Sequence, residues 1–326
     1  MPRPTCFTSS SIGPCPDLNK NFLERAETVS ITWDDAFYLG SLRDDNSYFR
    51  VFHQCEPKSV LDIVDRLIQI HKYYDLILGF DERVLRECPN AVFLTESACS
   101  WLPRKFGAID PLGNMRYENG VFHKNPVVMD YTPCDVSAKK FAVSFLTSSK
   151  RQFPGHILRQ EIFDNLPERI GELETFKHRS PPIISDKRTV LEPYMFSIVP
   201  ENSRQSGYYT EKLVDCFIAK TIPIYWGCTD IAKHFNADGI VQFEDMYELQ
   251  AKLRLLTPDF YQNRKAIIEE NFHKAMQGVH QWDLIENAIT LGIEKKKRDG
   301  VKREEVVSVT SPTPKHRLHR PLRRVQ

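Results

Sequence analysis

The chain has 326 residues, of which 41% are hydrophobic and 27% charged, and its formal net charge is +1. That length can bury the cores of two ordinary domains. No apolar run approaches the ~20 residues that span a bilayer, and the opening MPRPTCFTSSSIGPCP lacks the apolar core of a signal peptide. We therefore expect a cytoplasmic protein of two domains.

The net charge hides an asymmetric distribution. From Lys295 to the end there are eleven Lys and Arg against three Asp and Glu, a local excess of +8, which leaves −7 for the rest of the chain. Prolines and few large apolar residues predict that this tail, 295–326, is disordered. It could dock on anionic lipid headgroups as a peripheral membrane contact, or serve only solubility. No aromatic residues interleave with its charges, which argues against a nucleic-acid partner.

The eight cysteines contain no CxxC pair. Structural zinc sites use closely spaced ligand pairs, so this spacing argues against a bound metal. Cys216 and Cys228 flank apolar segments and are expected to act as small core residues. A reducing compartment suits this use of cysteine.

The first half alternates short apolar runs with one amphipathic segment. Alternation of this kind predicts an α/β layer, a Rossmann-like domain over 29–138 that follows an N-terminal extension, 1–28. The segment 97–138 has little periodicity and several prolines, and we expect an acceptor-side loop and the interdomain crossing there. Within it, Trp101 either stacks on a sugar or is buried. The expected strands are 29–33, 48–53, 75–79 and 91–94, and the expected helix is 60–70.

The second half, 139–294, shows the same alternation and predicts a second Rossmann-like domain. The segment 168–188 suggests no element. The expected strands are 140–147, 194–199, 221–226 and 239–243, and the expected helices are one with its apolar face at 157–163, one at 213–218, a short turn at 231–235, and 244–256, 258–276 and 282–293.

The most informative stretch runs from Phe196 to Gly227, FSIVPENSRQSGYYTEKLVDCFIAKTIPIYWG. A buried strand, a polar loop, an amphipathic helix and a second strand form the βαβ unit of a parallel sheet. Ligands of such folds bind beyond the carboxyl ends of the strands, at the start of the following helix. There, Lys212 could offer an ammonium to a diphosphate, and Glu211 could accept hydrogen bonds from hydroxyl groups. These residue types suit a sugar nucleotide, although such a pair is also common on solvated surfaces.

This stretch resembles the donor-site motif of the family 10 α-1,3/1,4-fucosyltransferases: an apolar strand, Glu-Asn, a short loop, Tyr, Thr-Glu-Lys and then Ile-Pro-Ile-Tyr-Trp-Gly. The resemblance extends over roughly 48–275 and is strongest over 190–245. It implies a GT-B fold, two Rossmann-like domains facing a cleft. It also implies transfer of fucose from GDP-fucose to a glycan hydroxyl with inversion, with no metal or other cofactor required for the chemistry and a divalent ion at most stimulatory.

The resemblance also assigns roles to individual residues. Glu56 matches the proposed general base, which an inverting transfer needs to take the acceptor proton, and His53 is the fallback. Arg151 matches an arginine that contacts the donor diphosphate, with Lys150 as the alternative.

Within the motif itself, Lys212 would bind phosphate, Glu211 sugar hydroxyls, and Asn202 and Tyr208 the ribose-phosphate region. Asp81 and Glu82 follow the strand 75–79 and either face the cleft or cap the next helix.

The segment 168–188 departs from the family pattern, where relatives often carry a glycine-rich stretch. The base-binding pocket could therefore differ. Two alternatives stay open: the same fold acting on another nucleotide sugar, and a non-catalytic glycan- or nucleotide-binding protein on the same scaffold.

Overall fold

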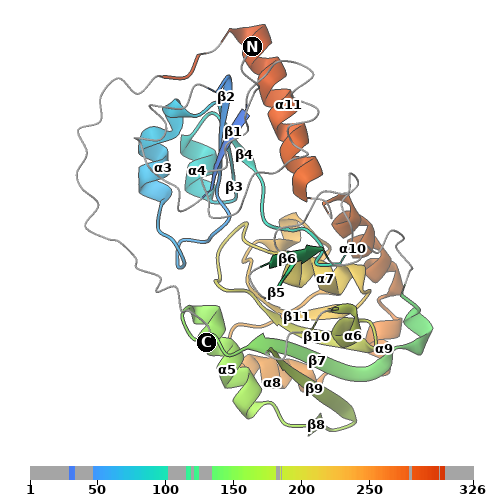
Figure 1. Ribbon diagram of the computed structural model, residues 1–326. Coiled ribbons are helices and arrows are strands. Elements are labelled where there is room, and N and C mark those ends of the chain that lie inside the picture. The colour runs from blue at the N-terminus through green and yellow to red at the C-terminus, as the bar shows by residue number, and fades with distance from the viewer. Residues whose placement is uncertain are drawn as a thin grey trace.

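The computed structural model describes residues 29–33, 47–101, 115–118, 121–124, 134–180, 184, 186–278, 281–300 and 302–304. Within these ranges the chain forms two α/β units, one above the other in Figure 1. The expected extension 1–28, most of the expected loop 97–138 and the tail beyond 304 lie outside the described residues. No helix in the described part is both long and apolar enough to cross a membrane.

The first unit is built on a parallel sheet in the order β1-β2-β3-β4. Helices α3 and α4 cover one face of this sheet through a buried cluster that includes Phe52, Leu67 and Ile77. Strands β2 and β3 are buried along their whole length because helices cover both faces. The described elements are β1 (Val29–Trp33), β2 (Phe49–His53), α3 (Val64–Ile70), η1 (His71–Tyr73), β3 (Leu76–Gly79), α4 (Glu82–Glu87) and β4 (Ala91–Phe93). A separate antiparallel hairpin consists of β5 (Met115–Glu118) and β6 (Val121–Lys124).

The second unit is built on a six-stranded sheet, described in the order β12-β11-β10-β7-β9-β8 and parallel except for β8. Buried clusters lie on both faces. Its elements are η2 (Val136–Ala138), β7 (Lys140–Ser148), α5 (Pro154–Asn165), β8 (Arg169–Ile170), β9 (Leu173–Ser180), α6 (Arg188–Leu191), β10 (Tyr194–Pro200), α7 (Glu211–Ile218), β11 (Ile222–Trp226), η3 (Ile231–Lys233), η4 (Ala237–Gly239), β12 (Val241–Gln242), α8 (Met246–Arg254), α9 (Pro258–Gln262) and α10 (Lys265–Gln277).

The predicted βαβ unit is confirmed as β10-α7-β11. The two strands pair in parallel, with Phe196 opposite Ile222 and Val199 opposite Tyr225. Every residue of α7 from Leu213 to Ile218 is buried. Strands β8 and β9 were not predicted; they fall within the segment 168–188, and β9 pairs with β7 in the sheet.

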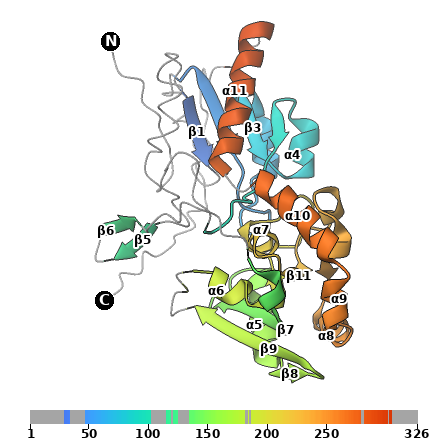
Figure 2. The ribbon, with the colours of Figure 1, turned by 90° about the vertical axis from the view of Figure 1, so that its right-hand side faces the viewer.

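Helix α11 (Gln281–Asp299) changes the expected organisation of the C-terminus. It follows the second unit in sequence but packs on the first, where Ile285, Ile289 and Ile293 contact β1, β2 and β3 (Figures 1 and 2). The spacing of these isoleucines places them on one face of the helix. The boundary expected at 294 therefore falls inside a continuous helix, and α11 belongs to the first unit.

The first residues of the expected tail are also held in place. Lys296 and Arg303 each lie 2.8 Å from a different carboxylate oxygen of Asp75, which is almost fully buried. Two cations compensate one buried carboxylate here, so residues 295–300 and 302–304 are part of the first unit.

Candidate functional site: the donor motif

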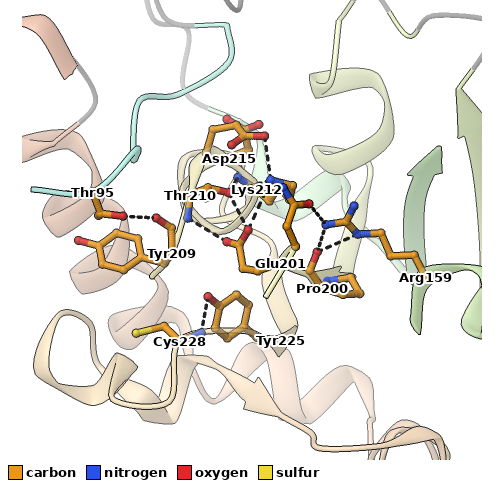
Figure 3. Close-up of polar contacts among 12 residues, drawn as sticks. Thr95, Arg159, Pro200, Glu201, Tyr209, Thr210, Lys212, Asp215, Tyr225 and Cys228 are labelled. Atoms are coloured by element: carbon orange, nitrogen blue, oxygen red, sulfur yellow. Dashed lines mark hydrogen bonds and ion pairs between the residues drawn. The ribbon is translucent and has the colours of Figure 1, made fainter. Parts of the chain in front are cut away.

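The loop after β10 is fixed by a buried carboxylate. Glu201 has no exposed side-chain surface, and its two oxygens accept from the Thr210 backbone N–H at 2.9 Å and from the Thr210 hydroxyl at 2.7 Å (Figure 3). Thr210 is in turn the N-cap of α7. Glu201 therefore determines where α7 begins and how its first turn is oriented.

Two lysines surround the predicted sugar-binding carboxylate. The ammonium of Lys212 lies 2.9 Å from Thr210 Oγ1, 3.4 Å from Glu201 and 3.3 Å from Glu211. Lys187 lies 3.6 Å from Glu211 and 2.9 Å from Asp215. Burial would raise the pKa of Glu211, but Lys212 and Lys187 lower it to about 2. Glu211 is therefore an ionised acceptor at neutral pH.

An arginine that is not among the predicted donor-binding residues joins this cluster. Arg159 of α5 is buried and donates through Nε and Nη2 to the Pro200 carbonyl at 3.0 and 2.7 Å. Its Nη2 also donates to Asn202 Oδ1 at 2.9 Å. Burial lowers the pKa of Arg159, while Glu201 and Glu211 favour its charged form. Asn202 is thus oriented by a guanidinium from the neighbouring helix.

The predicted phosphate ligand Arg151 is not part of the cluster. Both Arg151 and the alternative, Lys150, are exposed, and the side chain of Arg151 makes no hydrogen bond or ion pair with any other described residue. Of the predicted donor residues, the structure brings together Asn202, Tyr208, Glu211 and Lys212, and adds Arg159. The sequence contains one signal that could have identified Arg159, its spacing along the helix. Arg159 lies on the same face as Gly155, Ile162 and Leu166, all of which are buried.

Tyr208 connects this cluster to the first unit. Its side chain is buried, and its ring centroid lies 5.2 Å from that of Phe80, just after β3. Burial raises the pKa of Tyr208 well above its usual value, and Glu201, Glu56 and Glu211 raise it further. The phenol therefore stays neutral. Of these three carboxylates, Glu56 belongs to the other unit.

Further contacts join the carboxyl ends of the first sheet to the loop after β10. The Gln205 side chain accepts from the Lys58 backbone N–H and donates to Asp81, both at 3.1 Å, and Ser206 donates to Glu82 at 2.6 Å. Asp81 also caps α4 by accepting from two backbone N–H groups. Both expectations for Asp81, a cap and a position facing the other unit, are therefore met.

Gly207 lies against the backbone of the first unit. Its φ is +72°, and a Cβ there would lie 2.6 Å from the Phe80 carbonyl oxygen. Only glycine combines a left-handed conformation with this contact. One loop of the second unit is thereby fitted against the end of β3.

The candidate bases differ in accessibility. Glu56 lies on the loop after β2 and is half-buried, whereas His53 has no exposed surface at all. Burial lowers the pKa of His53 to about 3, so the ring is neutral. Glu56, the more exposed of the two, is the better candidate. Trp101 is buried in the core of the second unit, as the simpler of its two interpretations predicted.

Two groups of side chains could hold a metal ion among the described residues. One consists of His53, Cys55 and Glu96; the other consists of Cys228, Asp230 and His234. In the second group, Asp230 already accepts from the Gly207 N–H at 2.7 Å and pairs with Lys233 at 3.0 Å. That no metal is required stays a prediction.

The fold and the position of this cluster define a class of protein. Two Rossmann-like units, each with a parallel sheet, meet at the carboxyl ends of their strands, with a charged cluster at the start of a helix of the second unit. This is the GT-B fold of glycosyltransferases, as predicted. A crystal structure of an alpha1,3-fucosyltransferase shares the fold, with a TM-score of 0.52 and 17% sequence identity over 86% of this chain and 81% of that one.

Sequence comparison then gives particular relatives. The chain is 40% identical over 211 residues to the alpha-(1,3)-fucosyltransferase FucT of Helicobacter pylori. The aligned region is 64% of this chain and 40% of the relative. It is 44% identical over 52 residues to a putative fucosyltransferase of Acanthamoeba polyphaga mimivirus, 16% of this chain and 9% of that one. The chain thus spans less than half the length of these relatives. No protein-family model matches it. The resemblance to fucosyltransferases predicted from the donor motif is confirmed.

Proposed function

We propose that the protein is an inverting glycosyltransferase that moves fucose from GDP-fucose to a hydroxyl of an acceptor glycan. The observation that supports this proposal is the charged cluster at the start of α7, where Lys212 pairs with Glu211 and Arg159 donates to Asn202. The 40% identity to an alpha-(1,3)-fucosyltransferase supports the choice of sugar and of linkage class.

In this proposal, Lys212 and Arg159 stabilise the negative charge that develops on GDP as it leaves. Arg159 supplies positive charge and orients Asn202, because its Nε and Nη2 already donate to the Pro200 carbonyl and to the Asn202 side chain. Glu211 holds hydroxyls of the sugar. These charges stand in the free protein before the donor arrives, so they need little rearrangement during transfer.

The acceptor hydroxyl would lose its proton to Glu56 as its oxygen attacks the anomeric carbon. The C–O bond to fucose forms on the face opposite to the departing GDP, the bond to the β-phosphate oxygen breaks, and the configuration inverts. The acceptor is a glycan, and any contact with a membrane would fall to basic residues of the tail that follow Arg303.

Thermal unfolding with a panel of nucleotide sugars tests the donor. A ligand that binds only the folded state raises the melting temperature according to its affinity. We expect GDP-fucose and GDP to stabilise the wild type, and Lys212→Ala to lose most of this shift. Lys252→Ala removes an exposed lysine of α8 and serves as the matched control. Stabilisation by another nucleotide sugar alone would replace fucose in the proposal, and stabilisation by none would leave a non-catalytic scaffold.

A further inference from the structure

A histidine next to the donor cluster has an unsatisfied nitrogen. His156 lies in the first turn of α5 and is 4% exposed. Its Nδ1 is buried and has no hydrogen-bond partner among the residues that the structure describes. Buried polar atoms are seldom left without a partner, and such atoms often mark a functional site.

The surroundings of His156 are fixed by the contacts on either side of it. The Gly155 N–H donates to the Asn202 carbonyl at 3.0 Å, and Arg159, one turn later, donates to the Asn202 side chain at 2.9 Å. Phe153 packs on the imidazole with ring centroids 5.1 Å apart. The first turn of α5 is therefore seated directly on the residues that follow β10.

Three cations from different elements act on the ring. Burial, then Arg159, Lys150 and Lys212, lower the pKa of His156 to about 4, while the Asn202 side chain acts in the opposite direction. In the free protein the ring is neutral, because a fourth positive charge there would be repelled. Two of these cations, Lys212 and Arg159, are those that the proposed function assigns to the charge of the donor diphosphate.

We propose that His156 binds the donor diphosphate together with a proton, and that Nδ1–H of the resulting imidazolium donates to a phosphate oxygen. This inference rests on the proposed function. The phosphate charge offsets the three cations, so the charged ring becomes favourable once GDP is bound. One proton moves from solvent to the imidazole, and no covalent bond changes. Affinity for GDP should therefore rise as the pH falls.

Calorimetry of GDP binding at pH 6 and pH 8 tests this inference on the wild type, His156→Gln, His156→Asn and Lys212→Ala. We expect His156→Gln to weaken binding about 10-fold at pH 6 and about 2-fold or less at pH 8. The ionisation state of GDP itself changes with pH, but this change is the same for every variant. It therefore cancels in the ratio of wild-type affinity to variant affinity. His178→Gln is the matched control, because His178 on β9 also has a buried Nε2 without a described partner, while burial alone lowers its pKa.

The outcomes separate the two proposals. If the wild type does not bind GDP, or Lys212→Ala binds as tightly, the donor site itself is wrong. Suppose instead that the wild type binds GDP and Lys212→Ala does not. If His156→Gln then weakens GDP binding by the same factor at pH 6 and at pH 8, the proposed role of His156 is overturned. An equal loss in His178→Gln also overturns it. His156→Asn replaces the first variant if that one fails to fold, and if neither folds, binding to the wild type with net proton release at pH 7 contradicts the proposal.

Discussion

At the scale of single residues, the two arginines of the β7–α5 region give opposite predictions. Arg159 is buried against Pro200 and Asn202, whereas Arg151 is exposed. We expect Arg151→Ala to bind GDP within about 2-fold of the wild type. Arg159→Lys keeps the charge but loses the planar fork, and we expect about 10-fold weaker binding. Titration of GDP checks both, and equal affinities of the two variants would contradict the assignment.

Folding of these variants is controlled separately. Their melting temperatures without ligand show whether Arg159→Lys also loosens the loop after β10, because Arg159 donates to the Pro200 carbonyl. A loss of GDP binding is evidence for a role of Arg159 in the donor site only if the variant still unfolds cooperatively.

The depressed pKa of Glu211 predicts how stability depends on pH. An unfolded chain protonates this carboxyl near its ordinary value of ~4.3, while Lys212 and Lys187 keep it ionised down to about 2 in the folded protein. The unfolded state then binds the extra proton, so the stabilisation is present above pH ~4.5 and is lost as the pH falls toward 2. Urea unfolding of the wild type and Glu211→Gln at pH 6 and pH 3 measures this, and their difference should shrink at pH 3. A constant difference would contradict it.

The sequence predicted the composition of the site better than its geometry. Glu211 and Lys212 could be identified because they start an amphipathic helix between two apolar strands, a pattern that is local. Arg151 and Arg159 could not be separated in this way, because which arginine points toward β10 depends on how α5 packs on a strand some forty residues later. His156 was missed for the same reason.

At the scale of elements, the seat of α5 on the loop after β10 depends on one glycine. A Cβ at Gly155 would collide with the backbone carbonyl of Glu201. Adding one would therefore force α5 to move away from the loop after β10. We expect Gly155→Ala to lower the free energy of unfolding by ~1–3 kcal/mol and to weaken GDP binding, since Asn202 and Arg159 separate. Denaturant unfolding and GDP titration measure both.

Gly171 offers the matched control for that prediction. Its φ is +61°, and nothing lies within 4 Å of the position that a Cβ would take there. Gly171→Ala should cost ~1–2 kcal/mol through backbone strain alone and leave GDP binding unchanged. If both variants weaken GDP binding equally, the seat of α5 has no special role.

The elements themselves were predictable to different degrees. Strand β10 and helix α7 were recognisable because most of their buried residues are apolar. Strand β9, LETFKHRS, was not, because its side chains alternate with charged residues and most are only half-buried next to the short β8. Its place in the sheet comes from pairing with β7, a contact that no local pattern reveals.

At the scale of the whole molecule, a buried carboxylate of the first unit pairs with two cations from the end of the described chain. Asp75 is 5% exposed and receives Lys296, Arg303 and the Arg50 backbone N–H. Asp75→Asn leaves two positive charges without their partner, and we expect a loss of ~3–5 kcal/mol in the free energy of unfolding. Urea unfolding measures it.

Asp65→Asn is the matched control for Asp75. Asp65 also pairs with an arginine, Arg83, at 2.7 Å, but its side chain is 72% exposed. Exposed pairs contribute ~0–1 kcal/mol, so this variant should be nearly as stable as the wild type. A loss of similar size in both variants would show that burial of Asp75 is not what matters.

The packing of α11 on the first unit could not be predicted from the sequence. The spacing of its isoleucines indicates that one face is buried, but it does not indicate which surface that face covers.

The central claim is that Glu56 of the first unit and the donor cluster of the second act on one reaction. Release of GDP from GDP-fucose, measured with a panel of oligosaccharide acceptors for the wild type and Glu56→Gln, tests it most directly. We expect acceptor-dependent release by the wild type, a rate lower by ~10²–10⁴ in the variant, and GDP affinity the same in both. Wild-type rates in Glu56→Gln, with release of GDP intact, would contradict the account.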